Sequence, residues 1–214
     1  MAWTHTARFL TTASKLVELP VSELPEIAFV GRSNAGKSTA INVLTQQKRL
    51  AFASKTPGRT QHINLFELGP KLVPDAMFAD LPGYGYAAVE RSKKLRWQQV
   101  MAEYLEVRRS LTAIVLLVDS RLGFTELDMN LLDFVGVRVG SGSVKMLVLL
   151  TKADKLGRRT LDQSLARAQD TLAPLIGESA DVAVAPFSAL SRQGVNDAAI
   201  WLHRSISLSG VPDL

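Results

Sequence analysis

The stretch from residue 31 to residue 38 carries the residue types of a phosphate-binding loop. It reads G-x-x-x-x-G-K-S, with Gly31 and Gly36 at the glycine positions and Lys37 and Ser38 at the end. The glycines allow a tight turn whose backbone N–H groups face phosphate oxygens, while the lysine reaches the β- and γ-phosphates and the serine hydroxyl binds Mg²⁺. The predicted phosphate-contacting residues are Gly31, Arg32, Ser33, Asn34, Ala35, Gly36, Lys37 and Ser38.

The segments on either side supply the context that such a loop requires. Residues 26–30 are mostly apolar β-formers, as expected for a buried strand, and residues 39–44 can open a helix. The helix N-terminus then adds partial positive charge beside the phosphates. This strand–loop–helix context favours a phosphate loop over the alternative, a glycine-rich turn that matches the pattern by chance.

Two later motifs concern the γ-phosphate and the base. Residues 80–83 read D-x-x-G, in which Asp80 can hold Mg²⁺ and the Gly83 N–H can contact the γ-phosphate. Residues 151–154, Thr-Lys-Ala-Asp, are a variant of the N/T-K-x-D motif. The Asp154 carboxylate can accept hydrogen bonds from N1–H and the 2-amino group of guanine, which adenine does not offer, and the preceding lysine stem can cover the base.

A fourth motif follows the last apolar run. It is Ser-Ala-Leu at residues 188–190, where the Ala189 N–H can donate to guanine O6. D-x-x-G or Ser-Ala-Leu alone is weak because short patterns recur by chance, but four motifs in order, each at the end of an expected strand, indicate a GTP site. These motifs add Asp80, Leu81, Pro82, Gly83, Thr151, Lys152, Ala153, Asp154, Ser188 and Ala189 to the predicted nucleotide contacts.

Composition limits the possible chemistry. The chain has 214 residues, enough for one α/β domain with a sizeable core, and it has no cysteine, which excludes disulfides, thiolate nucleophiles and cysteine-based metal sites. No apolar run is long enough to span a bilayer, and the sequence offers neither a cysteine nor an N-terminal glycine for lipidation. A reducing cytoplasm is therefore the expected compartment, with no membrane partner.

Positive charge is unevenly distributed along a chain of net charge +5. Residues 32–66 include six basic residues and no acidic one, and a second cluster consists of Arg91, Lys93, Lys94 and Arg96. Two interpretations stay open. These residues form a face that meets a polyanion, or they are solvated surface apart from Lys37, which serves the nucleotide.

Strand-like and helix-like segments alternate along the chain. Strands are expected at residues 26–30, 61–68 (as an edge strand), 76–79, 113–119, 144–150 and 182–187. Helices are expected after the phosphate loop, over 95–109, after the cap Thr125, after a capping box at 160–163 and over 195–206. The helix after Thr125 is expected to bury Leu127, Leu131, Phe134 and Val135.

This alternation predicts a doubly wound α/β domain with a mostly parallel six-stranded sheet and helices on both faces. In such folds the loops at the carboxyl ends of the strands carry the binding groups. The expected units are an N-terminal arm over residues 1–24 packed on the domain, the GTP-binding domain over 25–208 and a tail over 209–214.

The same motifs carry a resemblance to a known family. In residues 31–38, 55–61, 80–86, 151–154 and 187–189 the chain resembles the EngB (YihA, YsxC) family of translation-factor-related bacterial GTPases. The likeness spans about residues 24–208, and its discriminating strings are Pro-Gly-Arg-Thr-Gln and Pro-Gly-Tyr-Gly-Tyr. The resemblance implies a P-loop GTPase switch that assists assembly of the large ribosomal subunit, with rRNA and protein of a subunit precursor as partners, and that is needed for cell division and septation. We expect a monomer.

The resemblance also assigns the first switch loop. It places the second Mg²⁺ ligand at Thr60, next to the expected strand, with Thr56 as the competing position. The expected metal ligands are then Ser38, Thr60 and Asp80. The further nucleotide contacts that it implies are Gly58, Arg59, Thr60, Gln61 and Phe187, and His62, beside the switch, is a candidate phosphate sensor.

Catalysis is the least determined part of the site. The expected catalytic residues are Lys37, Thr60, Gly83 and Asn34. Tyr84 stands where Ras-like enzymes carry the glutamine that orients the attacking water, so turnover is expected to be slow. The resemblance extends to GTPases in which the residue at Asn34 helps to hold K⁺; the alternative is that Asn34 only shapes the loop. Asp119 ends a strand but belongs to no motif, and we expect it to be a cap or loop residue.

Two other functions stay in competition. One is a GTP-dependent binding or scaffold module of the division machinery with negligible turnover, which measured phosphate release would separate from a GTPase switch. The other is a membrane-associated signalling GTPase, which the missing lipidation sites disfavour.

Overall fold

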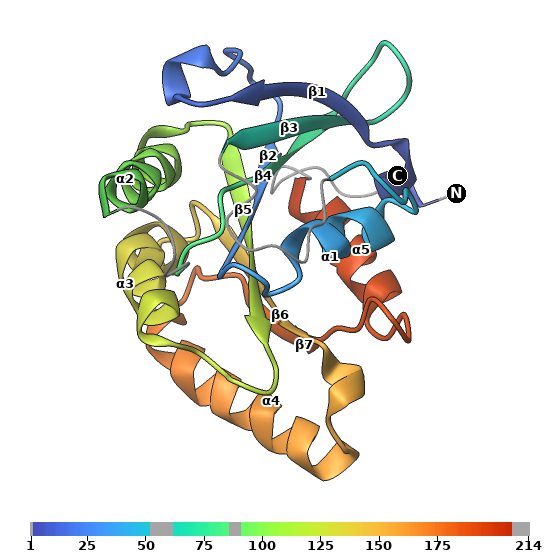
Figure 1. Cartoon of the computed structure of the whole chain (residues 1–214), viewed down its shortest axis with the longest axis vertical. Helices are drawn as coiled ribbons and strands as arrows, with labels where there is room; N and C mark the ends of the chain where they lie inside the picture. The colour runs from blue at the N-terminus through green and yellow to red at the C-terminus, as the bar shows by residue number, and fades with distance from the viewer. Residues whose placement is uncertain (1, 52–61, 86–90, 207–214) are drawn as a thin grey trace.

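The structure is a computed structural model that describes residues 2–51, 62–85 and 91–206, with the backbone alone for residues 91–98. The expected first-switch residues Thr56, Gly58, Arg59, Thr60 and Gln61 therefore lie outside the described residues. The described chain forms one sheet flanked by helices (Figure 1). The strands are β1 Arg8–Ala13, β2 Glu26–Gly31, β3 Ile63–Leu68, β4 Ala76–Asp80, β5 Leu111–Asp119, β6 Lys145–Thr151 and β7 Val182–Pro186. The α-helices are α1 Lys37–Leu44, α2 Arg91–Val107, α3 Glu126–Gly140, α4 Arg158–Leu172 and α5 Val195–Ile206.

The sheet has the strand order β1-β3-β4-β2-β5-β6-β7. The five strands from β4 to β7 in that order pair in parallel, whereas β1–β3 and β3–β4 pair antiparallel. This confirms the mostly parallel α/β fold, with one strand more in the described residues than the six expected. The added strand, β1, lies in the segment expected to be an arm.

Because β1 covers β3, β3 is not an edge strand, and that expectation was wrong. The pairing is reinforced across the two strands: Arg8 Nε donates to Glu67 Oε1 at 3.0 Å, and Thr12 Oγ1 donates to Asn64 Oδ1 at 2.7 Å. β1 mixes polar and apolar residues without a clear alternation, and five of its six residues are at least partly exposed in a pattern that the sequence alone does not reveal. It therefore gave no strand signal.

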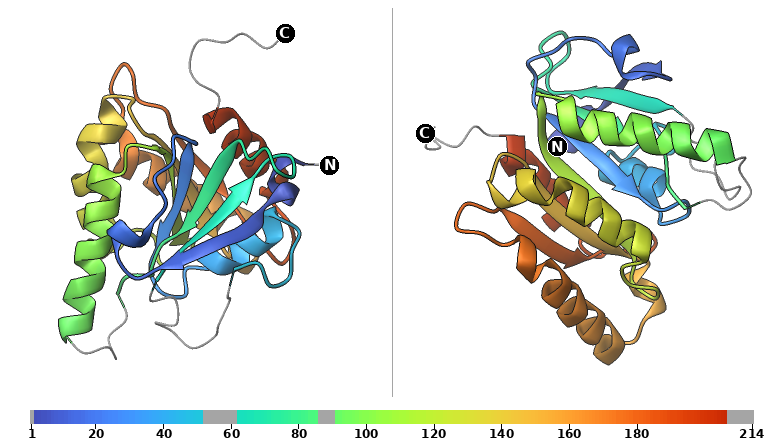
Figure 2. Two further views of the ribbon diagram at one scale, coloured as in Figure 1. Left: turned by 90° about the horizontal axis from the view of Figure 1, so that it is seen from above. Right: turned by 90° about the vertical axis from the view of Figure 1, so that its left-hand side faces the viewer.

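The two faces of the sheet are covered by different helices. α2, α3 and α4 lie side by side over one face, and α1 and α5 cover the other (Figures 1 and 2). The alternation along β2 shows this division: Ala28 and Val30 pack in the core with α2–α4, whereas Ile27 and Phe29 pack with α1 and α5. Burial on both faces explains why the parallel strands read as nearly continuous apolar runs.

Two details of the helices differ from expectation. α4 begins at Arg158 with Gly157 as its N-cap, and the Leu161 N–H donates to Gly157 O at 2.9 Å, so Thr160 is already inside the first turn and cannot be the cap. In α3, Leu131 and Val135 are buried, but Phe134 is 44% exposed because it falls beside the buried stripe. The Thr125 cap is confirmed: its N–H and Oγ1 both donate to Asp128 Oδ2, at 2.8 and 2.6 Å.

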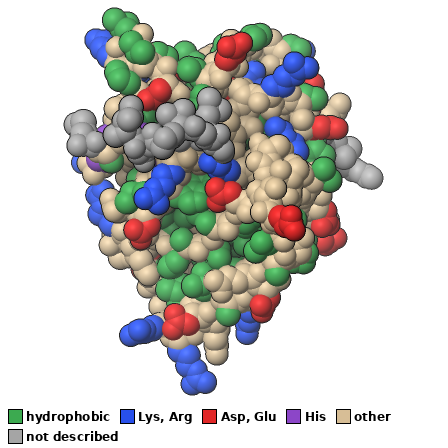
Figure 3. Space-filling view, turned by 180° about the vertical axis from the view of Figure 1, so that it is seen from behind, with side chains coloured by type: hydrophobic (Ala, Val, Ile, Leu, Met, Phe, Trp, Pro, Cys, Tyr) green, Lys and Arg blue, Asp and Glu red, His purple; other side chains and the backbone are tan. Residues whose placement is uncertain are grey.

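The surface seen from behind in Figure 3 combines an apolar centre with charged edges. Hydrophobic side chains gather in the middle of that face, and Lys and Arg side chains lie along its lower rim. Within the described part of the chain, no helix is both long and apolar enough to cross a membrane.

Candidate nucleotide-binding site

The phosphate loop joins β2 to α1, as the sequence predicted. At Gly31 a side chain cannot fit, because an added Cβ would lie 2.7 Å from Leu117 O on the neighbouring strand β5. Gly36, the N-cap of α1, has φ 101°, in the left-handed region that favours glycine. The two motif glycines thus serve the close packing of β2 and the sharp entry into the helix, which leaves the N-terminal N–H groups of α1 at the loop.

Lys37, Ser38 and Asp80 converge at the start of α1. Lys37 Nζ lies 2.8 Å from Asp80 Oδ1, and both side chains are buried. Ser38 Oγ donates to Asp80 Oδ2 at 3.4 Å. The D-x-x-G aspartate therefore meets the two polar side chains that end the phosphate loop, as the two motifs together predicted.

This cluster has the chemistry of a Mg²⁺ site. Mg²⁺ prefers hard oxygen ligands and is usually held by one or two carboxylates together with waters and substrate phosphates. Ser38 and Asp80 supply such oxygens, and the buried Asp80 Oδ1 has the Lys37 ammonium as its ion-pair partner. Among the described residues there is no group of three or more His, Asp or Glu side chains that could hold a metal ion.

The D-x-x-G loop is bonded to the phosphate loop. The Ser33 N–H donates to Tyr84 O at 2.8 Å, and Arg32 and Tyr84 form a parallel β-bridge. Gly83 lies so close that an added Cβ would be 3.1 Å from Ser33 N. Leu81 and Pro82, which complete the motif, are buried, and the Leu81 N–H donates to Phe29 O. Backbone contacts therefore join the two loops beyond the carboxyl ends of β2 and β4.

The Tyr84 side chain turns away from this edge. Its hydroxyl donates to Asp128 Oδ1 of α3 at 2.6 Å, and the ring is buried. Burial, together with the neighbouring Asp128 carboxylate, raises the pKa of Tyr84 well above its usual value. Tyr84 therefore packs against α3, and its hydroxyl faces Asp128 rather than a nucleophilic water.

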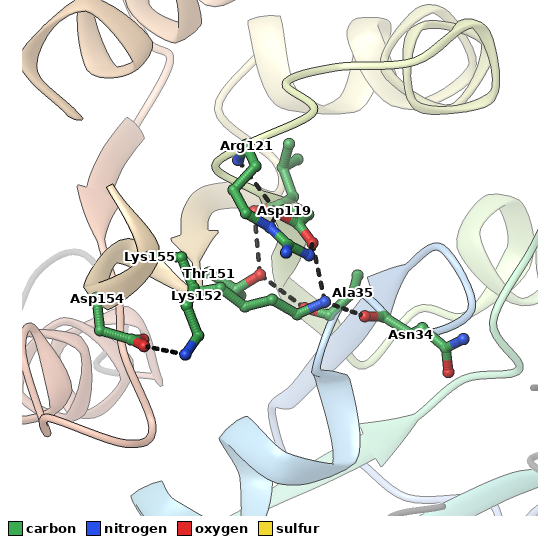
Figure 4. A network of polar contacts seen from close by, with 9 residues as sticks. Asn34, Ala35, Asp119, Arg121, Thr151, Lys152, Asp154 and Lys155 are labelled. Carbon is green, nitrogen blue, oxygen red and sulfur yellow. Dashed lines mark hydrogen bonds and ion pairs between the residues drawn. The ribbon is translucent and has the colours of Figure 1, made fainter. Parts of the chain in front are cut away.

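The Thr-Lys-x-Asp motif is bonded to the phosphate loop as well (Figure 4). Thr151 Oγ1 donates to Ala35 O at 2.7 Å. Lys152 Nζ donates to Asn34 O at 2.9 Å and to Asp119 Oδ2 at 2.8 Å. Asn34 has φ 68° and an exposed side chain, so its backbone carbonyl, rather than its amide, makes this contact. The arrangement draws the base motif and the phosphate loop into one site.

The base-recognition aspartate is held by the last motif. Asp154 Oδ1 accepts a hydrogen bond from Ser188 Oγ at 2.6 Å. That bond lowers the pKa of Asp154 below its usual value, with help from Lys155, so the side chain is a carboxylate at neutral pH. The Ala153 N–H donates to Phe187 O at 3.2 Å, which places Ala189, half-buried, beside the aspartate. Motifs far apart in the sequence thus meet, as the order of strand ends predicted.

Asp119 and Arg121 belong to this site although they were not in the predicted set. Arg121 donates to Asp119 through Nε at 2.9 Å and Nη2 at 2.7 Å, and Asp119 also accepts a hydrogen bond from Lys152 Nζ. Burial alone would raise the pKa of Asp119, but hydrogen bonds from Arg121 and Lys152 outweigh burial and hold that pKa well below the usual range. The sequence placed Asp119 at the end of a strand, but its register pairing with Thr151 depends on β5 and β6 being neighbours, which the sequence alone does not give.

His62 lies apart from these contacts. Its Nδ1 is 2.9 Å from Ser14 Oγ, next to β1, and its side chain is exposed. Among the described residues it makes no contact with the phosphate loop. The structure therefore adds nothing to its predicted place in the nucleotide site.

Comparisons with known proteins agree with this geometry. Residues 26–152 match the family model described as a 50S ribosome-binding GTPase. A protein from Acidovorax ebreus (strain TPSY), named probable GTP-binding protein EngB, is 64% identical over 203 residues, which cover 94% of this chain and 89% of the relative. The chain belongs to the EngB family of GTP-binding proteins. A second EngB relative, from Albidiferax ferrireducens, is 58% identical over 95% of this chain and 96% of its own length.

Solved structures confirm the fold of this EngB-family chain. A crystal structure of a probable GTP-binding protein EngB aligns with a TM-score of 0.64 at 20% identity, covering 85% of this chain and 98% of that one. The structure of Era with MgGDPNP and a segment of 16S ribosomal RNA aligns with a TM-score of 0.66 at 19% identity, covering 89% of this chain and 59% of that one. Family membership makes the chain a P-loop GTPase, of a class that uses Mg²⁺ with bound GTP or GDP.

Proposed function

We propose that this chain is a slow, Mg²⁺-dependent GTPase switch that assists assembly of the large ribosomal subunit and is needed for normal cell division and septation. The family model carries the proposal, because its description names 50S binding and its match over residues 26–152 includes the phosphate loop and the D-x-x-G loop. The partner would be the rRNA and protein of a subunit precursor, and the acting form a monomer in the cytoplasm.

We assign the nucleotide contacts from the site geometry. The backbone of residues 31–38 would bind the phosphates, with Lys37 leaving Asp80 for the β- and γ-phosphates. Ser38 and Asp80 would hold Mg²⁺, together with Thr60 outside the described residues; the ion, when bound, offsets charge that develops on the phosphates. Asp154, held by Ser188, would accept both guanine donors, and Lys152 would cover the base.

The proposed switching action rests on the joint between the two phosphate-sensing loops. A γ-phosphate that engages the Gly83 N–H would fix the D-x-x-G loop against Ser33, and hydrolysis would release it. α2 follows that loop, so nucleotide state would reposition the basic residues at its start. We propose that Lys93, Lys94 and Arg96 contact rRNA phosphates, whose binding weakens steeply with salt.

Slow hydrolysis follows from the place of Tyr84. Its hydroxyl is bonded to Asp128, so the residue that takes the sequence position of the Ras glutamine is engaged elsewhere. A K⁺ ion held by the exposed Asn34 amide would supply positive charge during phosphoryl transfer, as an arginine finger does. Otherwise Asn34 only shapes the loop.

Co-sedimentation with large ribosomal subunits tests the proposal. The chain loaded with a non-hydrolysable GTP analogue should pellet with the subunits, and the GDP-loaded chain should stay in the supernatant. A triple Ala variant of Lys93, Lys94 and Arg96 should bind nucleotide normally, pellet less and show a shallower salt dependence. Equal pelleting in both nucleotide states would contradict a switch.

The alternative is a GTP-dependent scaffold of the division machinery with negligible turnover. The buried Tyr84 favours this alternative, because its hydroxyl donates to Asp128 and does not face a nucleophilic water. Phosphate release in the presence of large subunits separates the two functions. Accelerated release supports the switch, and no release above the rate without protein supports the scaffold.

A further inference from the structure

A cleft of about 590 Å³ lies between α4 and the loop that follows β5. Its floor is apolar, with the buried side chains Leu150 and Ala168 and the partly exposed Phe124 and Met129. Small-molecule sites in proteins have volumes of roughly 300–1,000 Å³ and combine an apolar lining with a few polar groups. The cleft meets both conditions and lies outside the nucleotide contacts assigned above.

A buried hydroxyl lines this cleft. Ser120 comes directly after Asp119, the last residue of β5, and lines the cleft beside α4. The Ser120 backbone is bonded on both sides, its N–H to Thr151 O at 2.9 Å and its carbonyl to Ser164 Oγ at 2.9 Å. Ser120 Oγ itself, in a residue 4% exposed, has no hydrogen-bond partner in the described structure. Buried polar groups are rarely left unpaired, so this hydroxyl is an unsatisfied group just beneath the cleft surface, which a ligand atom reaches when the lining side chains shift.

The charges around the cleft favour an anion. Arg167 of α4 lines it and makes no ion pair within the described residues, and Arg121 stands at its mouth, 46% exposed. Asp170 is the one acidic residue in the lining. Guanidinium groups bind carboxylate, sulfonate or phosphate oxygens in a forked geometry. An apolar floor with an arginine at the rim fits a molecule with an apolar body and one anionic group.

The cleft is connected to the nucleotide site through a single side chain. Arg121 lines this cleft and also a smaller pocket of about 260 Å³ beside the phosphate loop, which Asn34 and Lys152 line as well. Arg121 pairs with Asp119, which in turn holds Lys152 on the phosphate loop (Figure 4). An anion that pairs with Arg121 weakens the ion pair between Arg121 and Asp119. Asp119 then interacts more strongly with Lys152, its other cationic partner.

We propose that the cleft between α4 and the β5–α3 loop is a second ligand site, which takes a small amphipathic anion and is coupled to the nucleotide site through Arg121 and Asp119. The apolar body of the ligand rests on Leu150 and Ala168. Its anionic group pairs with Arg167 and Arg121. By linkage, the ligand changes nucleotide affinity by the same factor by which the nucleotide changes ligand affinity.

Fluorescence titration with 8-anilinonaphthalene-1-sulfonate tests the site, since this probe joins an aromatic body to a sulfonate. Two variants alter the cleft: Gln163→Trp fills it, and Arg167→Ala removes the anion partner. Two matched controls, Gln169→Trp and Arg159→Ala, make the same changes at exposed α4 positions outside the cleft lining. GDP affinity, measured separately, shows that each variant is folded.

The expected result is one saturable site, weakened at least about fivefold in Gln163→Trp and Arg167→Ala and unchanged within about twofold in the controls. Probe affinity should differ at least about fivefold between nucleotide-free and GDP-saturated protein, and Arg121→Ala should remove that difference. Unsaturable binding, or equal affinity in all four variants, overturns the site. Equal probe affinity with and without GDP overturns the coupling. Neither outcome depends on ribosome binding.

Discussion

Replacing Asp119 by asparagine tests whether the phosphate loop and the base motif are held together by this carboxylate. Asp119 accepts a hydrogen bond from Lys152 Nζ at 2.8 Å, and the same ammonium donates to Asn34 O at 2.9 Å. An asparagine has one acceptor oxygen and a donor NH₂ group, so it cannot satisfy both Lys152 and Arg121. Lys152 then loses its anionic partner and holds the loop less firmly.

The size of the effect follows from the burial of the pair. A hydrogen bond to a charged group contributes about 1.5–3 kcal/mol. The Asp119 side chain is 7% exposed, so little of this is screened by solvent. If most of the loss appears in binding, GDP and GTP affinities fall about 10- to 100-fold, at 1.4 kcal/mol per factor of ten. Arg121→Ala is the matched control: its side chain is 46% exposed, and such pairs contribute about 0–1 kcal/mol, so affinity falls no more than about fivefold.

The pH dependence has a defined sign. The folded pKa of Asp119 is depressed, so its contribution is present above the unfolded value of about 3.9 and is lost as pH falls through the folded pKa. Asp119 is then a carboxylate throughout the range from about pH 5.5 to pH 8, so the ratio of GDP affinities between wild type and Asp119→Asn should be constant over that range. Titration of a fluorescent GDP analogue measures it. Wild-type affinity in Asp119→Asn, in protein whose urea unfolding shows a native fold, would refute this account of Lys152.

Three further predictions concern other parts of the molecule. Tyr84→Phe should lower the free energy of unfolding by about 1–2 kcal/mol in urea titrations and leave single-turnover hydrolysis nearly unchanged, because the lost bond is to Asp128; a large fall in rate would mean that the hydroxyl acts on the nucleotide. Glu26→Ala should cost about 3–5 kcal/mol of stability, because the buried carboxylate pairs with Arg108, while GDP affinity of the folded fraction is kept; a small loss in urea unfolding would contradict this. Hydrolysis should be faster in K⁺ than in Na⁺ at equal ionic strength, and Asn34→Ala should remove the difference; equal rates in the two salts would leave Asn34 a structural residue.

The sequence predicted the parallel core of the fold because that core obeys local rules. Strands β2, β4, β5 and β6 are buried on both faces, and an apolar run at an expected position identifies such a strand without further context. The sequence did not predict β1, because this strand is stabilised by its pairing with β3. Contacts such as Arg8–Glu67 join residues that are 59 apart in sequence. The predicted start of α4 was wrong for a similar reason. Gly157 caps this helix through its backbone conformation, which a pattern of side chains does not indicate.

The site shows the same division. Motif residues such as Lys37, Asp80 and Asp154 could be proposed from the sequence because the chemistry of nucleotide binding fixes their types and spacing. The supporting contacts were not, since the role of Asp119 depends on β5 and β6 being neighbours, and the role of Tyr84 depends on where α3 begins. The described structure therefore adds mainly the partners that hold the predicted residues in place.

The most direct test of the central claim joins base recognition to ribosome binding in one protein. Asp154→Asn should lose affinity for guanine nucleotides and accept xanthosine nucleotides, because an amide can donate to the 2-oxo group of xanthine. The account predicts that this variant co-sediments with large ribosomal subunits when loaded with a non-hydrolysable xanthosine triphosphate analogue and does not do so with the GTP analogue at the same concentration. Co-sedimentation that is the same with both analogues, or with neither nucleotide present, would contradict the claim that the nucleotide at this site controls ribosome binding.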